Sequence, residues 1–215
     1  GGRTLEMGRF LSSKTGISVL VFDFAGNGQS QGQFEDLTLS GQIKDLTTAV
    51  TWCRERIPGP VLTMGRSFGG TTVICQAAED HRVRSVCTWA APARPYDLFA
   101  GLAMGRSPDS ELITLQSPEG SLQIKGAFLD DLKKHDVLRS AGLIAPRRLM
   151  VVHGRRDESV SPRDAEKIYA AAGEPKTLRL IPDADHRFQI NAGLAWEATL
   201  EWIRTALASP RSFQK

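Results

Sequence analysis

The chain has 215 residues, of which 41% are hydrophobic and 24% are charged, and its formal net charge at pH 7 is +3. A chain of this length and composition buries a hydrophobic core of its own, which excludes a disordered or fibrous protein. The basic residues are spread without a block, so no nucleic-acid partner is expected. Apolar stretches such as residues 17–24 fall far short of the roughly 20 residues that span a bilayer, so no membrane partner is expected.

The cysteines indicate the redox environment. Cys53, Cys75 and Cys87 are an odd set without C-x-x-C spacing, and each lies in a mostly apolar run, where a reduced and packed thiol is typical. No basic-then-apolar segment has the pattern of a secretory signal. We therefore expect a cytoplasmic protein. The chain begins Gly-Gly-Arg without Met, and we expect that processing or truncation removed the original start.

Helical and strand-like segments alternate along the chain. Residues 4–14 repeat apolar side chains with a helical period and end at Gly16. Residues 17–24 are short, β-rich and apolar on both faces, which predicts a buried parallel strand, and residues 25–33 read as a glycine-rich loop. Further helices are predicted at 40–56, 68–78, 162–172 and 192–208, and further strands at 60–64, 83–89, 147–152 and 177–181.

This alternation predicts an α/β fold with a mostly parallel sheet and helices on both faces. Such sheets bind ligands beyond the carboxyl ends of their strands, so function is expected in the loops after strands. Residues 92–145 are too long for one crossover and predict an inserted cap, with an ordinary crossover helix and a long loop as the alternative. The core would then comprise residues 1–91 and 146–208, followed by a frayed tail at 209–215.

Residues 65–70 read G-R-S-F-G-G, a G-x-S-x-G pattern between a predicted strand and a predicted helix. A serine on such a sharp turn has a strained backbone, and the residues two before and two after it must be small, a need that Gly65 and Gly69 meet. The tetrapeptide M-G-R-S recurs further along the chain and ends at Ser107, but no glycine stands two residues after that serine. The pattern therefore favours Ser67 as a nucleophile over a structural turn serine.

A serine hydroxyl becomes nucleophilic when a base takes its proton, and this role requires an oriented histidine. His81 and His135 lie in polar stretches that are typical of solvated histidines. His153 ends a predicted strand and could reach a site, although a structural histidine is the favoured interpretation there. His186 lies between the last predicted strand and the last predicted helix, where a base serving Ser67 is expected.

The acid that orients the base should also follow a strand. Asp157 lies in the loop after the predicted strand at 147–152, and we predict it as the acid. Glu158 is the neighbour that could substitute. Asp183 and Asp185 flank His186 and are more typical of turn or capping residues. The chain order Ser, Asp, His agrees with one of three common orders for such triads.

Taken together, these motifs show that the chain resembles the α/β-hydrolases, with a nucleophile elbow at residues 65–70, an acid turn at 154–157 and a base at His186. Residues 23–30, D-F-A-G-N-G-Q-S, are similar to the D-x-x-G-x-G-x-S loop of the esterase, acyl-aminopeptidase and thioesterase-like branches. The likeness covers nearly all of residues 4–206 apart from the predicted cap. It implies an α/β-hydrolase fold that is short at its N-terminus.

The resemblance also implies an oxyanion hole made of two backbone N–H groups. The Phe68 N–H at the amino end of a predicted helix can supply one, aided by the helix dipole. In the family the other comes from a loop that precedes the first helix seen here. We therefore expect the second donor to be missing from this chain unless Gly1 or Gly2 lies close, and expect residues upstream of Gly1 to be missing.

No cofactor or metal is expected. The glycines at 26, 28 and 32 do not fit a dinucleotide fingerprint, because Gln31 stands where that fingerprint needs a glycine. No phosphate-binding G-x-x-x-x-G-K-[ST] occurs, and Asp183, Asp185 and His186 are too close together in sequence for a sound metal site without further ligands.

The expected function is hydrolysis of a small-molecule carboxylic ester through Ser67, His186 and Asp157 and an acyl-enzyme intermediate. A peptidase or thioesterase with the same residues and a non-catalytic ligand-binding member of the fold stay open, and the oligomeric state is not indicated. The apolar run at 96–104 is either pocket lining or a helix face packed on the core. Trp89 is similarly either core or pocket wall.

Overall fold

The computed structural model describes residues 2–104, 111–117 and 120–208. Some of the sequence-based predictions concern residues outside these ranges, namely Gly1, Ser107 and the tail at 209–215. Within the described ranges, no helix combines the length and the apolar character that a membrane crossing requires.

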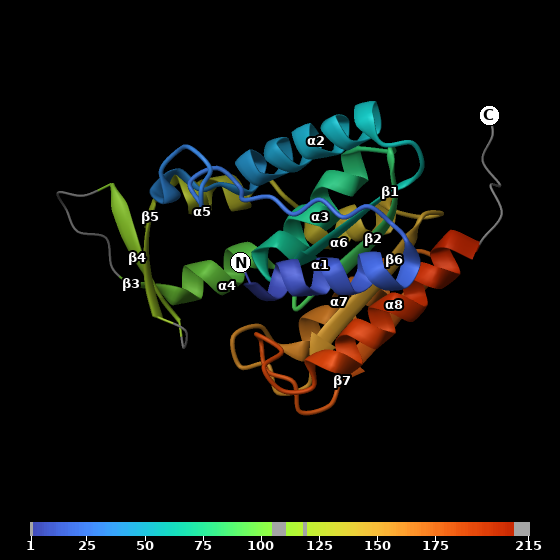
Figure 1. Cartoon of the computed structure of the whole chain (residues 1–215). Coiled ribbons are helices and arrows are strands. Elements are labelled where there is room, and N and C mark those ends of the chain that lie inside the picture. The colour runs from blue at the N-terminus through green and yellow to red at the C-terminus, as the bar shows by residue number, and fades with distance from the viewer. Residues whose placement is uncertain (1, 105–110, 118–119, 209–215) are drawn as a thin grey trace.

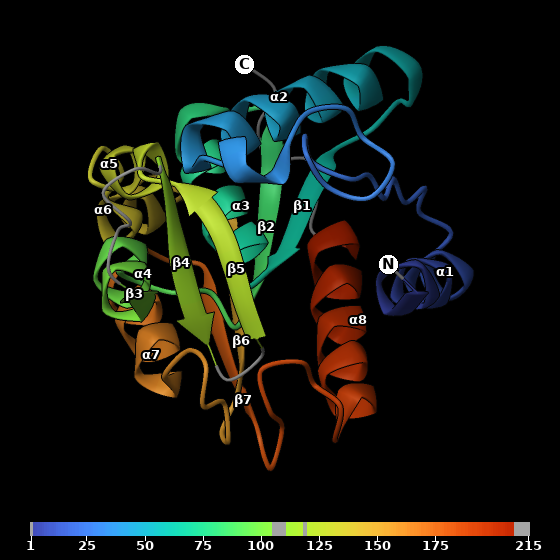
Figure 2. The same cartoon turned by 90° about the vertical axis from the view of Figure 1, so that its left-hand side faces the viewer.

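A four-stranded sheet forms the centre of the fold, and all its neighbouring strands are parallel (Figures 1 and 2). The strand order is β1-β2-β6-β7, with β1 at Val61–Arg66, β2 at Val83–Trp89, β6 at Arg148–Gly154 and β7 at Lys176–Ile181. Parallel pairing brings the carboxyl ends of these strands to one edge of the sheet. The predicted parallel sheet is confirmed.

Helices cover both faces of this sheet, as predicted, and Figure 2 shows α1 and α8 together on one side. These two helices span Gly2–Thr15 and Ala192–Ala208, and the other face carries α2 (Leu39–Arg56), α3 (Phe68–Glu79), α6 (Val137–Leu143) and α7 (Pro162–Ala171). Side chains of a strand alternate between its faces. In β2, Val86 therefore packs with α2 and α3 while Cys87 packs with α1 and α8, which explains why the central strands are apolar throughout.

Residues 17–24 are not the buried strand that the sequence predicts. The segment has no strand assignment, and Val19, Leu20 and Val21 are 41%, 45% and 37% exposed. A strand needs a partner for its backbone N–H and C=O groups, and no strand of the described ranges pairs with this segment. It lies instead beside α1, where Val19 approaches Gly8. The segment has the apolar composition of a buried strand, but such a run becomes a strand only where another strand pairs with it.

The glycine-rich loop that follows is closed by Asp23. The Asp23 carboxylate accepts the Gln29 N–H at 3.2 Å, and the Asp23 carbonyl oxygen accepts the Ser30 hydroxyl at 2.6 Å. Gly28 has a φ of 54°, and a Cβ there would fall on the Asp23 carboxylate. The D-x-x-G-x-G-x-S motif therefore builds a turn whose ends are joined by its first and last residues.

Between β2 and α6 the chain leaves the main sheet. This stretch contains α4 (Pro95–Leu102), α5 (Ala127–Leu132) and a separate antiparallel sheet of β3 (Ala103–Met104), β4 (Leu112–Ser117) and β5 (Gly120–Lys125). Figure 1 shows the small sheet at one end of the molecule. A single-turn 3-10 helix, η1 (Phe34–Asp36), is joined to it by an ion pair of 2.6 Å between Asp36 and Lys125. The boundaries of the predicted cap stay a prediction. They include α6, which packs against the core helices α3 and α7.

Two of the three cysteine thiols are packed in the core. Cys75 and Cys87 are buried, and burial raises the pKa of each thiol to about 12. Cys53 is partly exposed, and burial raises its pKa as well. All three thiols are free, as the sequence predicts.

A sharp turn joins β1 to α3 at Ser67. The residue has a φ of 54° and a ψ of −125°, a conformation that costs a non-glycine residue roughly 1–3 kcal/mol. Its N–H donates to the Trp89 carbonyl oxygen at 2.8 Å, which fixes the turn to the end of β2. The strained strand-to-helix turn that the sequence predicts is therefore present.

The glycines around this turn differ from the expectation at one position. A Cβ on Gly65 would fall on the Gly69 carbonyl group, so Gly65 must be small as predicted. A Cβ on Gly69 would meet no atom of the described residues within 4 Å, so this position has room for an alanine and does not require glycine. The second tight position is Gly70, where a Cβ would fall on Thr88 Oγ1 and lie 2.8 Å from Ala91 Cβ.

These contacts predict opposite effects for two neighbouring substitutions. Gly70→Ala should lower the free energy of unfolding by about 1–3 kcal/mol, because the added methyl group overpacks the space against β2. Gly69→Ala should leave it unchanged or raise it by up to about 1 kcal/mol, because alanine favours the helix. Urea unfolding of both variants measures the difference. Equal destabilisation by the two substitutions would contradict the assignment.

Candidate active site

The structure brings Ser67, His186 and Asp157 together beyond the carboxyl ends of β1, β7 and β6. Ser67 Oγ lies 2.9 Å from His186 Nε2, and His186 Nδ1 lies 2.8 Å from Asp157 Oδ2. A carboxylate oxygen only accepts, so the proton of the ring is on Nδ1, which leaves Nε2 free to accept the serine hydrogen. This arrangement can transfer a proton from the hydroxyl to the imidazole.

The Asp157 carboxylate is buried between two backbone N–H groups and two imidazole rings. Its Oδ1 accepts the backbone N–H groups of Ser159 at 3.0 Å and Val160 at 2.8 Å. Its Oδ2 faces His186 at 2.8 Å and His153 at 3.0 Å. Burial raises the pKa of this carboxyl, but the hydrogen bonds from His153, His186 and Val160 outweigh burial and hold the pKa well below its usual range. Asp157 is therefore ionised at neutral pH.

His153 is the residue of this cluster that sequence reasoning did not select. The sequence favoured a structural histidine there, and the structure places its ring on the carboxylate of Asp157. The available signal was spacing, since a histidine at the end of a strand stands four residues before the predicted acid.

The remaining acidic candidates have structural partners. Asp183 pairs with Arg156 at 2.9 Å, and Asp185 Oδ1 accepts the Gln189 N–H at 2.7 Å. These contacts are those of the turn and capping residues that the sequence predicts. Glu158, the predicted substitute for the acid, is exposed.

A second serine, histidine and aspartate cluster lies at the amino end of α2. His135 Nε2 lies 2.9 Å from Ser40 Oγ, and Ser40 Oγ donates to Asp131 Oδ1 at 2.7 Å. The serine hydrogen is thus held by a carboxylate, and His135 is not placed to remove it. The side chain of His135 is 13% exposed, so this residue is less solvated than the sequence suggests, whereas His81 is exposed as expected.

The amide of Phe68 is the predicted oxyanion donor. It belongs to the first residue of α3, where helix geometry leaves the N–H groups without partners inside the helix. Within the part of the chain that the structure describes, this N–H has no hydrogen-bond acceptor. An anion forming next to Ser67 would meet this donor and the positive end of the helix dipole. The absence of a second donor from the chain stays a prediction.

The residue that follows the nucleophile belongs to an aromatic cluster. The Phe68 ring packs on Phe99 of α4 with centroids 5.6 Å apart and on Phe128 of α5 at 5.5 Å. The predicted apolar run at 96–104 therefore reaches the residue that follows Ser67. Trp89, in contrast, is 4% exposed and packs in the core.

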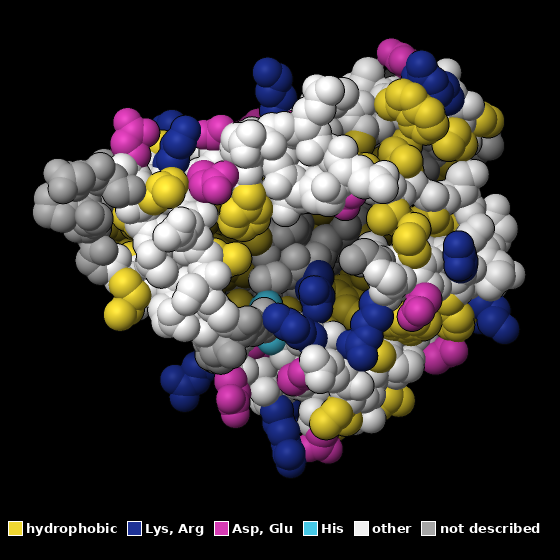
Figure 3. Space-filling view, turned by 60° about the vertical axis from the view of Figure 1, so that its left-hand side comes forward, with side chains coloured by type: hydrophobic (Ala, Val, Ile, Leu, Met, Phe, Trp, Pro, Cys, Tyr) yellow, Lys and Arg dark blue, Asp and Glu magenta, His cyan; other side chains and the backbone are white. Residues whose placement is uncertain are grey.

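A hollow of about 490 Å³ opens beside the base. It is lined by Arg156, Glu158, Ser159, Asp185, His186, Arg187 and Gln189. Figure 3 shows Lys and Arg side chains on one side of a histidine in a hollowed part of the surface. This lining suits the polar part of a ligand bound next to the imidazole.

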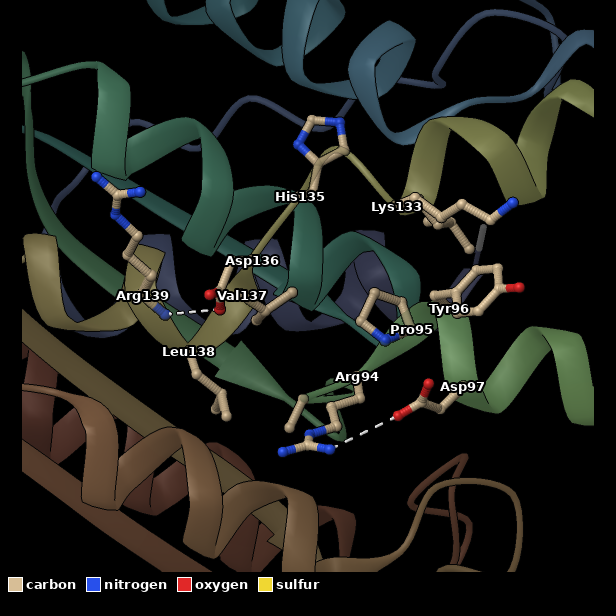
Figure 4. A pocket seen from close by; sticks show the side chains of 12 residues that line it. Arg94, Pro95, Tyr96, Asp97, Lys133, His135, Asp136, Val137, Leu138 and Arg139 are labelled. Carbon is tan, nitrogen blue, oxygen red and sulfur yellow. Dashed lines mark hydrogen bonds and ion pairs between the residues drawn. The ribbon is translucent and has the colours of Figure 1, made fainter.

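A hollow of similar volume lies at the start of α4 and α6 and is drawn in Figure 4. Its lining contains none of the three predicted catalytic residues. Its charged groups have partners, since Arg94 lies 3.9 Å from Asp97 and Lys133 lies 2.9 Å from Asp130. The paired charges leave no clear ligand preference at this hollow.

No three His, Cys, Asp or Glu side chains of the described residues gather as a metal site would require.

The pKa of Asp157 predicts how stability depends on pH. A carboxyl whose pKa is lower in the folded than in the unfolded chain stabilises the fold above the unfolded value of about 4, and this contribution is lost as the pH falls towards the folded value. The free energy of unfolding should therefore fall between about pH 5 and pH 3 more steeply in the native protein than in Asp157→Asn. Urea unfolding across this range measures the slopes.

Asp183→Asn, which removes a half-exposed carboxylate from a neighbouring loop, corrects for the loss of a charge alone. Equal slopes in the native protein and in Asp157→Asn would contradict the buried, hydrogen-bonded carboxylate.

A family model of the X-Pro dipeptidyl-peptidase (S15 family) matches residues 9–114. The match includes the elbow at Ser67 and ends before Asp157 and His186. The chain is also 30% identical over 200 residues to YfhR of Salmonella typhimurium, an uncharacterized protein, and the aligned part covers 90% of this chain. This chain spans 64% of the length of that relative.

Solved structures share the fold. Est1E from Butyrivibrio proteoclasticus, solved with ferulic acid bound, superposes with a TM-score of 0.85 over 96% of this chain and 84% of its own, at 21% identity. The esterase domain of a Rhodothermus marinus protein gives a TM-score of 0.74 over 94% and 80% of the two chains, at 24% identity. With its parallel sheet, its strained serine turn and these structural likenesses, the chain has the α/β-hydrolase fold.

Proposed function

We propose that the protein is a serine hydrolase that cleaves carboxylic esters of small molecules. The observation that carries this proposal is the continuous hydrogen-bonded chain from Ser67 Oγ through His186 to Asp157, at 2.9 and 2.8 Å, on the ligand-binding edge of the sheet. The strained turn at Ser67 supports the same role, because backbone strain of this kind is concentrated at functional sites.

The geometry leads to a two-step reaction. His186 Nε2 takes the hydrogen of Ser67 as Oγ attacks the ester carbonyl carbon, and the Phe68 N–H faces the oxygen on which negative charge develops. Asp157 holds the ring in the required tautomer and stabilises the imidazolium. His186 then protonates the leaving alcohol, and a water molecule repeats the sequence on the acyl-enzyme and releases the acid.

Two features near Ser67 support an ester in which one side of the ester bond is apolar or aromatic and the other side is polar. The Phe68 ring, which follows the nucleophile, packs on Phe99 and on the buried Phe128, whereas the hollow beside His186 has a polar lining. The fold likeness to Est1E with bound ferulic acid supports hydroxycinnamoyl esters as the first class to examine.

A peptidase is the second candidate, and the match of residues 9–114 to the S15 family favours it. The same three side chains would serve an amide bond, but an amine leaving group demands protonation by His186 before the bond breaks. An enzyme of this kind would have to recognise a proline residue next to the scissile bond.

The first test identifies the nucleophile with a fluorophosphonate probe. We expect labelling of the native protein, no labelling of Ser67→Ala and strongly reduced labelling of His186→Ala, because the probe reacts with a serine that a base activates. Intact-mass spectrometry measures the adduct. Ser40→Ala and His81→Ala are matched controls, and both should label like the native protein.

Activity should follow the same pattern. Asp157→Asn should lower kcat by up to about 10⁴-fold, because an amide in place of the carboxylate favours the wrong imidazole tautomer. A folded Ser67→Ala variant that still labels and hydrolyses esters would exclude Ser67 as the nucleophile.

The second test separates the two substrate classes. We expect p-nitrophenyl and hydroxycinnamoyl esters to be cleaved with a higher kcat/KM than an X-Pro p-nitroanilide. Phe99→Ala should lower kcat/KM for the hydroxycinnamoyl ester about tenfold relative to a p-nitrophenyl acetate reference, because the aromatic contact is lost. Preferential cleavage of the X-Pro substrate would favour the peptidase.

A further inference from the structure

A second histidine lies against the acid of the proposed triad. His153 stands near the end of β6, and its side chain is 0% exposed. Its Nε2 lies 3.0 Å from Asp157 Oδ2 and 3.0 Å from the Val160 carbonyl oxygen. The same carboxylate oxygen faces His186 Nδ1 at 2.8 Å, so two imidazole rings meet at one atom.

The partners of His153 determine which of its nitrogens carries the hydrogen. The Asp157 carboxylate and the Val160 carbonyl are both acceptors, so Nε2 must be the donor. Nδ1 is buried and has no hydrogen-bond partner in the described part of the chain. A polar atom buried without a partner is unfavourable, and an apolar side chain would avoid it. The feature that an apolar residue cannot replace is the Nε2–H.

This donor completes a cradle that fixes the rotation of the carboxylate. The Ser159 and Val160 N–H groups hold Oδ1, and they belong to the turn that carries Asp157 itself. On Oδ2, His186 is the ring that must move charge and accept protons during the reaction. His153, whose Nε2–H donates to the Val160 carbonyl oxygen and whose Nε2 lies 3.0 Å from Oδ2, is therefore the ring beside Oδ2 that comes from the sheet and stays in place.

The backbone around this pair is equally constrained. His153 lies opposite Leu180 in the pairing of β6 with β7, which anchors its position. A Cβ on Gly154 would fall on the Ala184 carbonyl group, and the Arg156 N–H donates to that oxygen at 3.0 Å. The turn bearing the acid and the loop bearing His186 are thus packed on each other next to His153.

We propose that His153 is a positioning residue of the hydrolase. Its Nε2–H donates to the Val160 carbonyl oxygen, and its Nε2 lies 3.0 Å from Asp157 Oδ2, so the ring ties the turn that carries the acid to β6 and keeps this oxygen in line with His186 Nδ1. This inference rests on the proposed function, because positioning matters only if His186 serves Ser67.

Two substitutions separate the donor from the bulk of the ring. His153→Leu removes the Nε2–H, and we expect kcat to fall about tenfold with KM changed less than about twofold, because a hydrogen bond to a charged group is lost while substrate contacts are kept. His153→Gln carries an amide N–H close to the position of Nε2 and should restore most of kcat. Steady-state hydrolysis of a p-nitrophenyl ester measures both.

A double-mutant cycle shows whether the effect passes through the acid. In an Asp157→Ala background, His153→Leu should change kcat less than about twofold, since the oriented group is already gone. Val152→Ala, the preceding buried residue of β6, is a control for destabilisation of the strand, and its kcat should stay within about twofold of the native value. Thermal unfolding of each variant accompanies the kinetics.

Two results would overturn the proposal. One is an unchanged kcat in a folded His153→Leu protein. The other is an equal loss of kcat with and without Asp157, which would mean that His153 acts by a different route.

A readout that does not depend on turnover keeps this inference separate from the proposed function. Imidazole ¹⁵N NMR reports the tautomer of His186, which should be Nδ1–H in the native protein and His153→Gln and a mixture in His153→Leu. A native protein without Ser67-dependent hydrolysis would refute the proposed function, and the NMR comparison would still decide the role of His153. An unchanged His186 tautomer in His153→Leu would refute that role.

Discussion

The site is organised around one buried negative charge. A carboxylate removed from water must be compensated by polar groups, and Asp157 is surrounded by two backbone N–H groups at Ser159 and Val160 and by the rings of His153 and His186. These groups come from a strand, from the turn after it and from a loop more than twenty residues away. The need to satisfy one charge therefore fixes the positions of three segments relative to one another.

The three candidate catalytic residues could be predicted from the sequence because each follows a strand of a parallel sheet. In that topology strand ends converge, so residues distant in the chain reach the same edge whatever the details of packing. The convergence of Ser67, Asp157 and His186 could therefore be predicted without knowing any individual contact. The need for glycine at position 65 could also be predicted, because the group that a Cβ there would meet belongs to the same turn.

The features that sequence reasoning missed depend on contacts between distant segments. Gly70 is tight because Thr88 and Ala91, at the end of the neighbouring strand, occupy its surroundings, and no local pattern shows this. Residues 17–24 have the composition of a buried strand, yet a strand exists only where another strand pairs with it. The contact of His153 with Asp157 also arises in three dimensions, although the four-residue spacing gave a partial signal.

The buried thiols of the core have a consequence for chemical labelling. Thiol reagents attack the thiolate, and a pKa near 12 at Cys75 and Cys87 keeps these sulfur atoms protonated and inside the core at neutral pH. Cys53 is partly exposed, but its pKa is raised as well. Electrophilic probes used at neutral pH will therefore meet two sulfur atoms, those of Cys75 and Cys87, that stay protonated within the core.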